Sequence, residues 1–509
     1  MKQVTPPEHT LSIIVLTVEA TPDPWILDMT KRCRYLRPYE FIVVLDRHRK
    51  TVIAQAKEAG CTIHAVDQAV SVDDRRVMGA KAAKGTTVLF LEQDCRLEPE
   101  QLLSFLQPVL YGSAHAVTPH RKPLQEDICL PQTEEVWAAC FNRLMNREDL
   151  LACSMNDTPY ALTQHALSVL GTAGLQNPIA AYAALMKSGL KIARYSYSAP
   201  VTKSRYTNLQ EHGAVQYELS PYERKTIDRY LQAFASYIAK PRGGFPDGNR
   251  RRDLIEKLRN GITSFKVVRS NSHMSTDTAR PNERALSVIV PARNEEATIA
   301  PLLEQLHRLE PAELIVVVNG SQDRTCELAL AHGATVVLSS DALGTDTGRA
   351  LGAYHATGRI LLFVDGDMVL SAHDLYPFVL AIRQGYDVAL NDQNYHLERE
   401  FPLRSILPSV YALNLALDQK PLGTSSMVMV PFGLSRKALN AIGWESLLCP
   451  PRALAASVRH ALRIVLPHRV NVEKANRLRP EKHLTGTAIN QIVGDHIEAL
   501  HSVLDYRNH

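Results

Sequence analysis

A long internal repeat is the feature of this 509-residue sequence that most restricts its fold. LSIIV at 11–15 answers LSVIV at 286–290 at an offset of 275 residues, and PYALT at 159–163 answers PFGLS at 431–435 at an offset of 272. An offset that drifts by only three residues over about 150 positions indicates a duplicated unit. The sequence therefore predicts two homologous domains in tandem.

The repeat divides the chain into domains at residues 1–240 and 286–509, joined by a basic linker at 241–285. The linker is rich in Gly, Pro, Asn, Ser and Arg, which is typical of connecting segments. Apolar residues recur inside it at helical spacing, namely Leu254, Ile255, Leu258, Ile262 and Phe265. Two interpretations stay open: a short helix packed on a domain, or a basic amphipathic helix that lies on an anionic membrane.

Composition excludes several classes of protein. Lys plus Arg exceeds Asp plus Glu by only four, so no nucleic-acid partner is expected. The longest apolar runs fall well short of the ~18 residues that a membrane-spanning helix needs, and no signal-peptide pattern follows Met1. The eight cysteines form no CxxC pair, which favours reduced, buried thiols. We expect a cytoplasmic protein, with peripheral contact to the inner face of the membrane as an open alternative.

Short apolar runs alternate with helical patterns in the second domain. Strands are expected at 286–290, 313–318, 334–338 and 359–364. Helices are expected at 295–309, 326–331 and 348–356. This alternation predicts an α/β fold in which each domain has a mostly parallel sheet flanked by helices. In such sheets ligands bind outside the carboxyl ends of the strands.

Polar clusters follow three of the expected strands. PARNEE occupies 291–296, NGSQDRT occupies 319–325 and DGD occupies 365–367. Two carboxylates one residue apart offer the hard oxygen ligands that divalent cations prefer, and the Gly between them lets the backbone turn close to a ligand. A cation held there can bridge a diphosphate and neutralise the charge that develops on it as a leaving group.

These segments resemble glycosyltransferase family 2, whose members have the GT-A fold. VIVPARNEEATI is similar to the opening motif of the family, and VVVNGSQDRT is similar to its nucleotide-contacting segment. GTDTGRALGAYHATGRILLFVDGD resembles the stretch that leads to the metal-binding DxD motif. The resemblance is tight over residues 286–370 and looser beyond. It implies two tandem GT-A-like domains and a metal-dependent glycosyltransferase that uses a nucleotide-diphosphate sugar and Mn²⁺ or Mg²⁺.

The resemblance also implies site residues in the second domain. The resemblance assigns binding of the nucleotide sugar to Pro291, Asn294, Glu295, Asn319, Asp323, Arg349 and Asp365. Metal binding falls to Asp365 and Asp367, with His496 as an additional ligand. Many family members carry two Asp residues where this chain has Val318 and Asn319, so the donor nucleotide stays open.

The sequence gives a weaker signal for the catalytic base than for the donor-binding residues. Glu445 is the acid in the region where the family places its base, and Asp392 and Glu398 are rival candidates. The acceptor stays open among a glycan, a small phosphorylated acid and a lipid-linked molecule. Two other functions compete with sugar transfer: a sugar-phosphate nucleotidyltransferase and a non-catalytic nucleotide-sugar-binding protein.

The first domain keeps the strand pattern but changes the chemistry at the strand ends. Glu92-Gln93-Asp94 stands in place of the DGD motif, and the Gly-Ser of the nucleotide segment is lost, although Arg76 still aligns with Arg349. Because three strand-end clusters differ together, we expect a degenerate first domain that serves as a scaffold or binds the acceptor, and a second active transferase stays open as the alternative.

Overall fold

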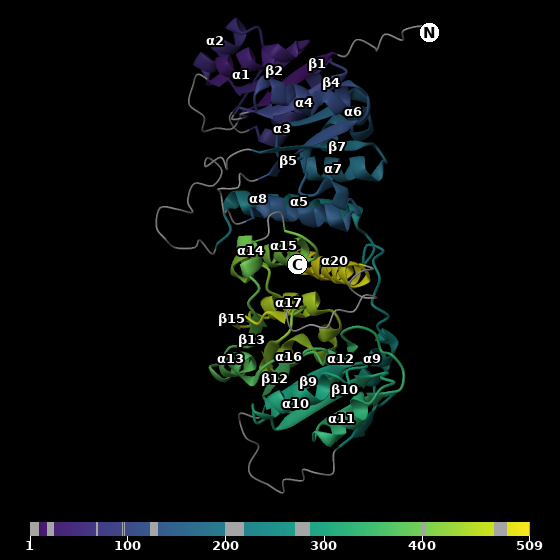
Figure 1. Ribbon diagram of the computed structural model, residues 1–509. Helices are drawn as coiled ribbons and strands as arrows, with labels where there is room; N and C mark the ends of the chain where they lie inside the picture. The colour runs from purple at the N-terminus through teal and green to yellow at the C-terminus, as the bar shows by residue number, and fades with distance from the viewer. Residues whose placement is uncertain are drawn as a thin grey trace, which may run out of the picture. The chain divides into compact units, whose positions relative to one another are not determined.

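The chain forms two compact units. The first comprises Met1–Gln216 and Ser220–Ala239, and the second comprises Tyr217–Leu219 and Lys240–His509. The computed structural model describes residues 10–17, 25–67, 70–93, 95, 97–122, 131–198, 218–269, 286–399, 403–472 and 486–507. Each unit contains a sheet with helices packed against it (Figure 1). The predicted fold class, α/β with two mostly parallel sheets flanked by helices, is confirmed.

Within its described residues, the first unit has a seven-stranded sheet in the order β3-β2-β1-β4-β6-β5-β7. Its strands are β1 Leu11–Leu16, β2 Glu40–Asp46, β3 Thr62–Val66, β4 Thr87–Glu92, β5 Ala116–Lys122, β6 Tyr160–Thr163 and β7 Ile192–Ser198. Its helices are α1 Trp25–Cys33, α2 Lys50–Glu58, α3 Val72–Ala82, α4 Pro99–Leu110, α5 Thr133–Leu144, α6 Gln164–Leu170, α7 Pro178–Lys187 and α8 Pro221–Tyr237, with short 3₁₀ turns η1 Arg34–Leu36, η2 Glu148–Leu150 and η3 Thr172–Gln176. Strand β6 runs antiparallel to β4 and β5, whereas the other pairs are parallel.

The second unit has an eight-stranded sheet among its described residues, in the order β15-β13-β14-β12-β9-β10-β11-β8. Its strands are β8 Lys266–Val268, β9 Leu286–Ala292, β10 Glu313–Asn319, β11 Thr335–Ser339, β12 Ile360–Phe363, β13 Val388–Asn391, β14 Phe432–Ser435 and β15 Ile464–His468. Its helices are α9 Arg252–Arg259, α10 Ile299–His307, α11 Thr325–Ala331, α12 Thr347–His355, α13 Ala372–Arg383, α14 Tyr395–Arg399, α15 Leu407–Ala416, α16 Arg436–Ile442, α17 Pro450–Arg459 and α20 Thr487–Arg507, with 3₁₀ turns η5 Lys420–Leu422 and η6 Trp444–Leu448. The strands and helices expected from the sequence in this unit are present, with ends that shift by a few residues.

The two sheets share one strand order, apart from the added β8 at one edge of the second. They also share a local device at the start of their central strands. In the first unit the Gly85 amide donates to Ser12 Oγ at 2.8 Å, and Ser12 donates to Glu40. In the second the Gly358 amide donates to Ser287 Oγ at 2.9 Å, and Ser287 donates to a glutamate at the matching position of β10. The same side chains therefore join three neighbouring segments in each sheet.

The described part of the segment expected to be a linker, residues 241–269, packs on the second unit. Helix α9 buries Ile255 and Leu258 in the core of that unit, and β8 pairs with β11 at the edge of its sheet. Ile262, just after the helix, is 71% exposed. Of the two interpretations of this segment, the structure shows a helix packed on a domain, because the apolar face of α9 is already covered by protein.

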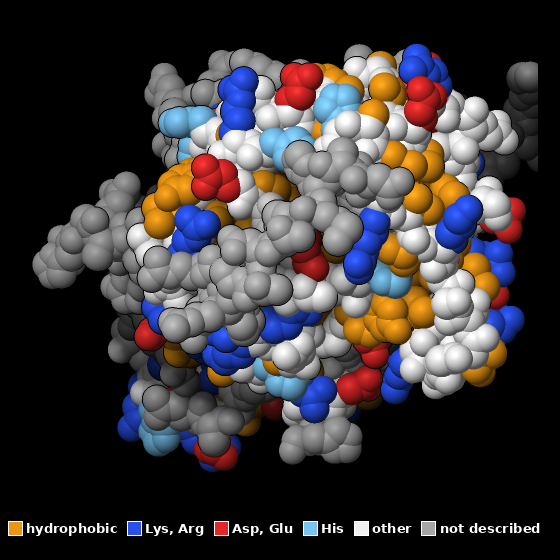
Figure 2. Space-filling view, turned by 90° about the horizontal axis from the view of Figure 1, so that it is seen from below, with side chains coloured by type: hydrophobic (Ala, Val, Ile, Leu, Met, Phe, Trp, Pro, Cys, Tyr) orange, Lys and Arg blue, Asp and Glu red, His pale blue; other side chains and the backbone are white. Residues whose placement is uncertain are grey.

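No helix among the described residues is both long enough and apolar enough to cross a membrane. On the described part of the face in Figure 2, basic and acidic side chains are interspersed with hydrophobic ones.

Candidate functional site

The loops that follow β9 and β10 are joined by hydrogen bonds at the carboxyl edge of the sheet. The Glu295 amide donates to Thr325 Oγ1 at 2.8 Å, and the Gln322 amide donates to Asn294 Oδ1 at 2.8 Å. Asn294 has a φ of 57°, a left-handed conformation that asparagine tolerates better than most residues. These contacts place Asn294 and the buried Glu295 beside the second loop.

Asp323 organises the same pair of loops through its carboxylate. Its Oδ2 accepts from the Glu296 amide at 3.0 Å, and its Oδ1 accepts from the Thr325 amide at 3.0 Å and hydroxyl at 2.5 Å. Burial raises the pKa of Asp323, but the hydrogen bonds from Thr325 and Glu296 outweigh that effect and hold the pKa below its usual value. Asp323 is therefore a charged group that fixes both loops.

The loop after β12 lies directly against the end of β9. The Gly366 amide donates to the Pro291 carbonyl at 3.0 Å, and the Gly366 carbonyl accepts from Thr298 Oγ1 at 2.7 Å. A Cβ atom on Gly366 would lie 3.0 Å from the Pro291 carbonyl oxygen. The Gly between the two acids therefore has a packing reason, because a side chain there would push the loop away from β9.

Arg349 lies at the start of α12 and binds the first acid of the DGD motif. Its Nη2 donates to the two carboxylate oxygens of Asp365 at 2.8 and 3.1 Å, and its Nη1 lies 3.1 Å from Asp346. Burial lowers the pKa of Arg349, but the two carboxylates outweigh that effect and raise it, so the guanidinium stays charged. Helix α12 can approach this closely because Gly348 packs on Pro291, where an added Cβ would lie 2.7 Å from the Pro291 Cβ.

Asp365 and Asp367 suit a hard divalent cation by their chemistry. Carboxylate oxygens are the ligands that Mg²⁺ and Mn²⁺ prefer, and both side chains follow β12 at the edge where the loops meet. Asp365 shares its oxygens with Arg349, but a carboxylate has about four acceptor positions and can still bind a cation.

Asn319 has a clear structural task. Its Nδ2 donates to the Gly344 carbonyl at 3.0 Å, and its Oδ1 accepts from the Leu343 amide at 2.5 Å. The side chain thus fastens the end of β10 to the loop that leads into α12. These contacts bring together most of the predicted site residues, and Asp367 follows Gly366 in the same loop: Pro291, Asn294, Glu295, Asn319, Asp323, Arg349 and Asp365.

The two candidate bases lie in different places. Strand β13 runs parallel to β12 with β14 between them, so Asp392, which follows β13, lies at the same edge, about 10 Å away at the usual strand spacing. Glu445 lies in η6, where the ring of its neighbour Trp444 contacts Tyr354 near the end of α12 and its carboxylate lies 3.8 Å from Arg259. This position is on the flank of α12, so of these two candidates we retain Asp392, and the third candidate, Glu398, stays a prediction. The Glu398 side chain lies outside the described residues.

His496 is wholly buried within α20. Its Nδ1 lies 2.7 Å from the Ile492 carbonyl and therefore donates to it, since a carbonyl only accepts. Its neighbour Asp495 instead contacts Arg250, and adjacent helix residues point in directions about 100° apart. The structure therefore joins Asp495, not His496, to the residues around α12.

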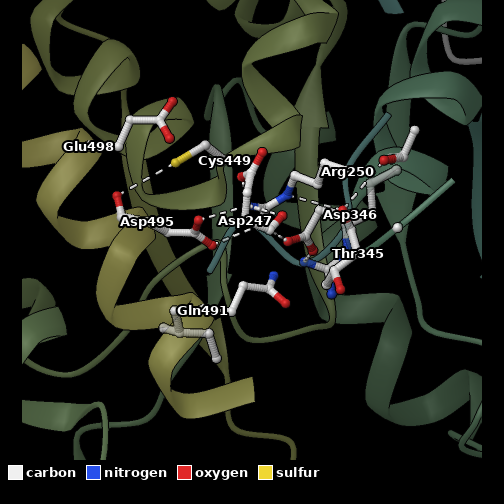
Figure 3. A network of polar contacts seen from close by, with 12 residues as sticks. Asp247, Arg250, Thr345, Asp346, Cys449, Gln491, Asp495 and Glu498 are labelled. Atoms are coloured by element: carbon white, nitrogen blue, oxygen red, sulfur yellow. Dashed lines mark hydrogen bonds and ion pairs between the residues drawn. The ribbon is translucent and has the colours of Figure 1, made fainter. Parts of the chain in front are cut away.

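Sequence reasoning missed Arg250, Asp346 and Asp495, which form a buried network (Figure 3). Arg250 lies in a run of three arginines, which resembles a solvated basic segment. One signal could have found part of the network: Asp346 aligns with Asp73, three residues before the aligned pair Arg349 and Arg76.

The buried His496 predicts a loss of stability in acid. Burial lowers its pKa from 6.5 to about 4, so between these values the unfolded chain takes up a proton that the folded chain does not. Stability is complete above pH 6.5 and falls as the pH drops toward 4, by about 3 kcal/mol in all. Thermal unfolding at pH 7 and pH 5 should show His496→Gln losing less stability on acidification than the wild type. Equal losses in the two proteins would contradict this assignment.

Comparison with known proteins assigns part of the second unit. Residues 287–443 match the family described as glycosyl transferase family 2. The 4,4'-diaponeurosporenoate glycosyltransferases of Staphylococcus aureus strains N315 and USA300 are 34% and 33% identical over 143 residues. That alignment covers 26% of this chain and 38% of each relative, so the chain spans well under half the length of these curated relatives.

Among solved structures, the chain is similar to glucosyl-3-phosphoglycerate synthase from Mycobacterium tuberculosis. The complex with Mn²⁺, uridine diphosphate and glucosyl-3-phosphoglycerate is 21% identical, with a TM-score of 0.34, and the alignment covers 43% of this chain and 80% of that one. The complex with Mg²⁺ and uridine diphosphate is 22% identical, with a TM-score of 0.33.

Proposed function

We propose that the second unit is a metal-dependent glycosyltransferase that moves a sugar from a nucleotide-diphosphate sugar to an acceptor. One observation carries the proposal: the loops after β9, β10 and β12 are hydrogen-bonded into one site that ends in Asp365-Gly366-Asp367. The match to glycosyl transferase family 2 at residues 287–443 contains all three loops. An acidic and arginine-containing site of this kind suits a donor whose diphosphate is held by a cation.

Each side chain has a role in this proposal. Asp365 and Asp367 would hold Mn²⁺ or Mg²⁺, which would neutralise charge on the departing diphosphate. Arg349 adds a fixed positive charge beside Asp365, and Asp323 holds the loops that line the nucleotide pocket. Asp392, at the same edge of the sheet, is the candidate base for the acceptor hydroxyl.

Contacts in the first unit support the part of this proposal in which that unit is a degenerate copy of the second. Arg75 aligns with Gly348, and its guanidinium, which is buried, donates to the Thr17 hydroxyl at 2.8 Å and carbonyl at 3.3 Å at the end of β1. A large side chain therefore occupies the strand end where the second unit has a glycine. Asp94, which aligns with Asp367, lies outside the described residues.

The filled strand end predicts one donor site per chain. Calorimetric titration of a nucleoside diphosphate in the presence of Mn²⁺ should give one equivalent bound per chain, because Arg75 occupies the matching place in the first unit. The Asp367→Asn variant is the control and should abolish that single event. Two equivalents of similar affinity would show that the first unit also binds donor.

A nucleoside-diphosphate release assay tests the function itself. Purified chain is incubated with UDP, GDP, TDP and ADP sugars, with Mn²⁺ or Mg²⁺ and then with chelator. Release from one donor, lost with chelator, is the expected result. Release of pyrophosphate from a nucleoside triphosphate and a sugar phosphate would indicate nucleotidyl transfer instead. Metal-dependent nucleotide binding without turnover would indicate a binding protein.

A further inference from the structure

A series of ion pairs with alternating charges connects the C-terminal helix α20 to the DGD motif. Asp495 binds Arg250, Arg250 binds Asp346, Asp346 binds Arg349, and Arg349 binds Asp365. In each of these four ion pairs the N–O distance is 3.1 Å or less. The position of Asp365 therefore depends on contacts that begin outside the site described above, at Asp495, Arg250 and Asp346 (Figure 3).

Arg250 is the central residue of this series of ion pairs, and its side chain is completely buried. Its Nη1 and Nη2 donate to the two oxygens of Asp495 at 2.8 and 2.9 Å, and Nη2 also donates to Asp346 at 2.7 Å. Its Nε donates to the Thr345 carbonyl at 3.1 Å, and Asp247 accepts from Nη1 at 3.0 Å. A buried arginine with this many partners holds each of them in one geometry.

The backbone around Arg250 is also locked to the loop before α12. The Arg251 amide donates to the Leu343 carbonyl at 2.9 Å, and the Thr345 amide donates to the Gly248 carbonyl at 3.1 Å. A Cβ atom on Gly344 would collide with the Asn249 carbonyl group. The backbone of residues 248–251 therefore holds the loop that leads into α12, although these residues lie outside the 287–443 match.

Asp346 shows why the link from Arg250 matters. This residue caps α12 in a left-handed conformation, with a φ of 60°. A left-handed aspartate persists only when its surroundings hold it. Its two carboxylate oxygens bind Arg250 on one side and Arg349 on the other. Asp346 thus transmits the position of Arg250 to the arginine that holds Asp365.

The first unit contains the same connection in another form. Asp73, which aligns with Asp346, binds Arg76 at 2.6 Å and also binds Arg229 of α8. Arg229 occupies the position in α8 that Asp495 occupies in α20. In the first unit the last helix, α8, therefore supplies the arginine that binds the aspartate directly. In the second unit the last helix, α20, supplies Asp495, and Arg250 lies between Asp495 and Asp346. In each unit, an ion pair that involves the last helix, α8 or α20, thus holds the aspartate at the start of α3 or α12.

We propose that Arg250 is a positioning residue for the donor site, which fixes Asp346 and through it the Arg349–Asp365 pair. This inference rests on the proposed function, because it assigns Arg250 a role at the same metal and diphosphate site. It also extends the set of residues that position Asp365 to Arg250, outside the 287–443 match.

Arg250→Met tests the proposal, with Arg251→Met as the matched control. Arg251 is the neighbouring arginine, and its side chain is 41% exposed and paired with Asp253. We expect Arg250→Met to weaken Mn²⁺ binding in the presence of a nucleoside diphosphate, measured by electron paramagnetic resonance, and to lower kcat/KM about 10- to 100-fold. Arg251→Met should stay within about twofold, since surface changes have small effects. Arg250→Lys should recover only part of the loss, because one ammonium cannot bind both carboxylates in the same geometry.

A second variant covers the case in which Arg250→Met fails to fold. Asp346→Asn keeps the shape of the side chain and leaves the Arg250–Asp495 pair intact, and it should reproduce the loss of Mn²⁺ affinity. In the double variant the losses should not add, because both changes break one connection. Additive losses, or a folded Arg250→Met with wild-type Mn²⁺ affinity and kinetics, would overturn the inference. A wild-type chain that binds Mn²⁺ and nucleotide but transfers no sugar would overturn the proposed function alone.

Discussion

Asp367→Asn is expected to lower the rate of sugar transfer by roughly a thousandfold, which corresponds to about 4 kcal/mol of transition-state stabilisation. The amide keeps the size of the side chain but loses the charge that would bind the cation. Asp367 gives a cleaner test than Asp365, because Asp365 also neutralises the buried Arg349. The measurement is nucleoside-diphosphate release with saturating Mn²⁺, together with a thermal unfolding curve that shows the variant to be folded.

The first unit offers a matched control for this experiment. Glu92 ends β4 as the aligned counterpart of Asp365, and it is buried at 6% exposure. If the chemistry belongs to the second unit, Glu92→Gln should keep transfer near the wild-type rate. Loss of transfer in Glu92→Gln would assign a catalytic role to the first unit. Sugar transfer at the wild-type rate by the Asp367→Asn variant would contradict the proposed metal site.

The strand framework and the three strand-end loops could be predicted because their signals are local. A buried parallel strand reads as a continuous apolar run, as in 314–318, and the polar residues that follow it mark the edge where ligands bind. Glycines such as Gly348 and Gly366 also show in the sequence, although the reason for each is visible only when its contact with Pro291 is known.

The ion-pair network could not be predicted because its members are far apart in the sequence. Arg250 and Asp495 are separated by 245 residues, and each lies in a segment whose pattern is ordinary. The family resemblance predicts His496 as a ligand, whereas one step along α20 decides which side chain faces Arg250. Glu445 was favoured by its place in the chain, and the packing of η6 on α12 puts it on the flank.

Gly85→Ala is expected to cause the largest loss of stability, about 3 kcal/mol, and to confine it to the first unit. A Cβ atom at this position would lie 2.7 Å from the Ser12 amide nitrogen and 2.8 Å from the Thr10 carbonyl oxygen. Both neighbours are backbone atoms next to β1, so no rotation of a side chain relieves the clash. In a unit of this size the loss corresponds to a fall in Tm of about 6–12 °C, measurable by calorimetry.

Two further glycines make this prediction specific. Gly174 has open space around it, with Leu170 Cβ 4.0 Å from an added Cβ, so Gly174→Ala should change Tm little. Gly358 donates to Ser287 Oγ as Gly85 donates to Ser12 Oγ, so the two glycines hold matching places in their sheets, and from this match we expect Gly358→Ala to lower the transition of the second unit instead. We expect separate transitions, because the described buried clusters around β1 and around β9 each draw on one unit. A single transition lowered equally by Gly85→Ala and Gly358→Ala would show that the two units unfold together, and the Ser–Gly contact would then stabilise the whole chain.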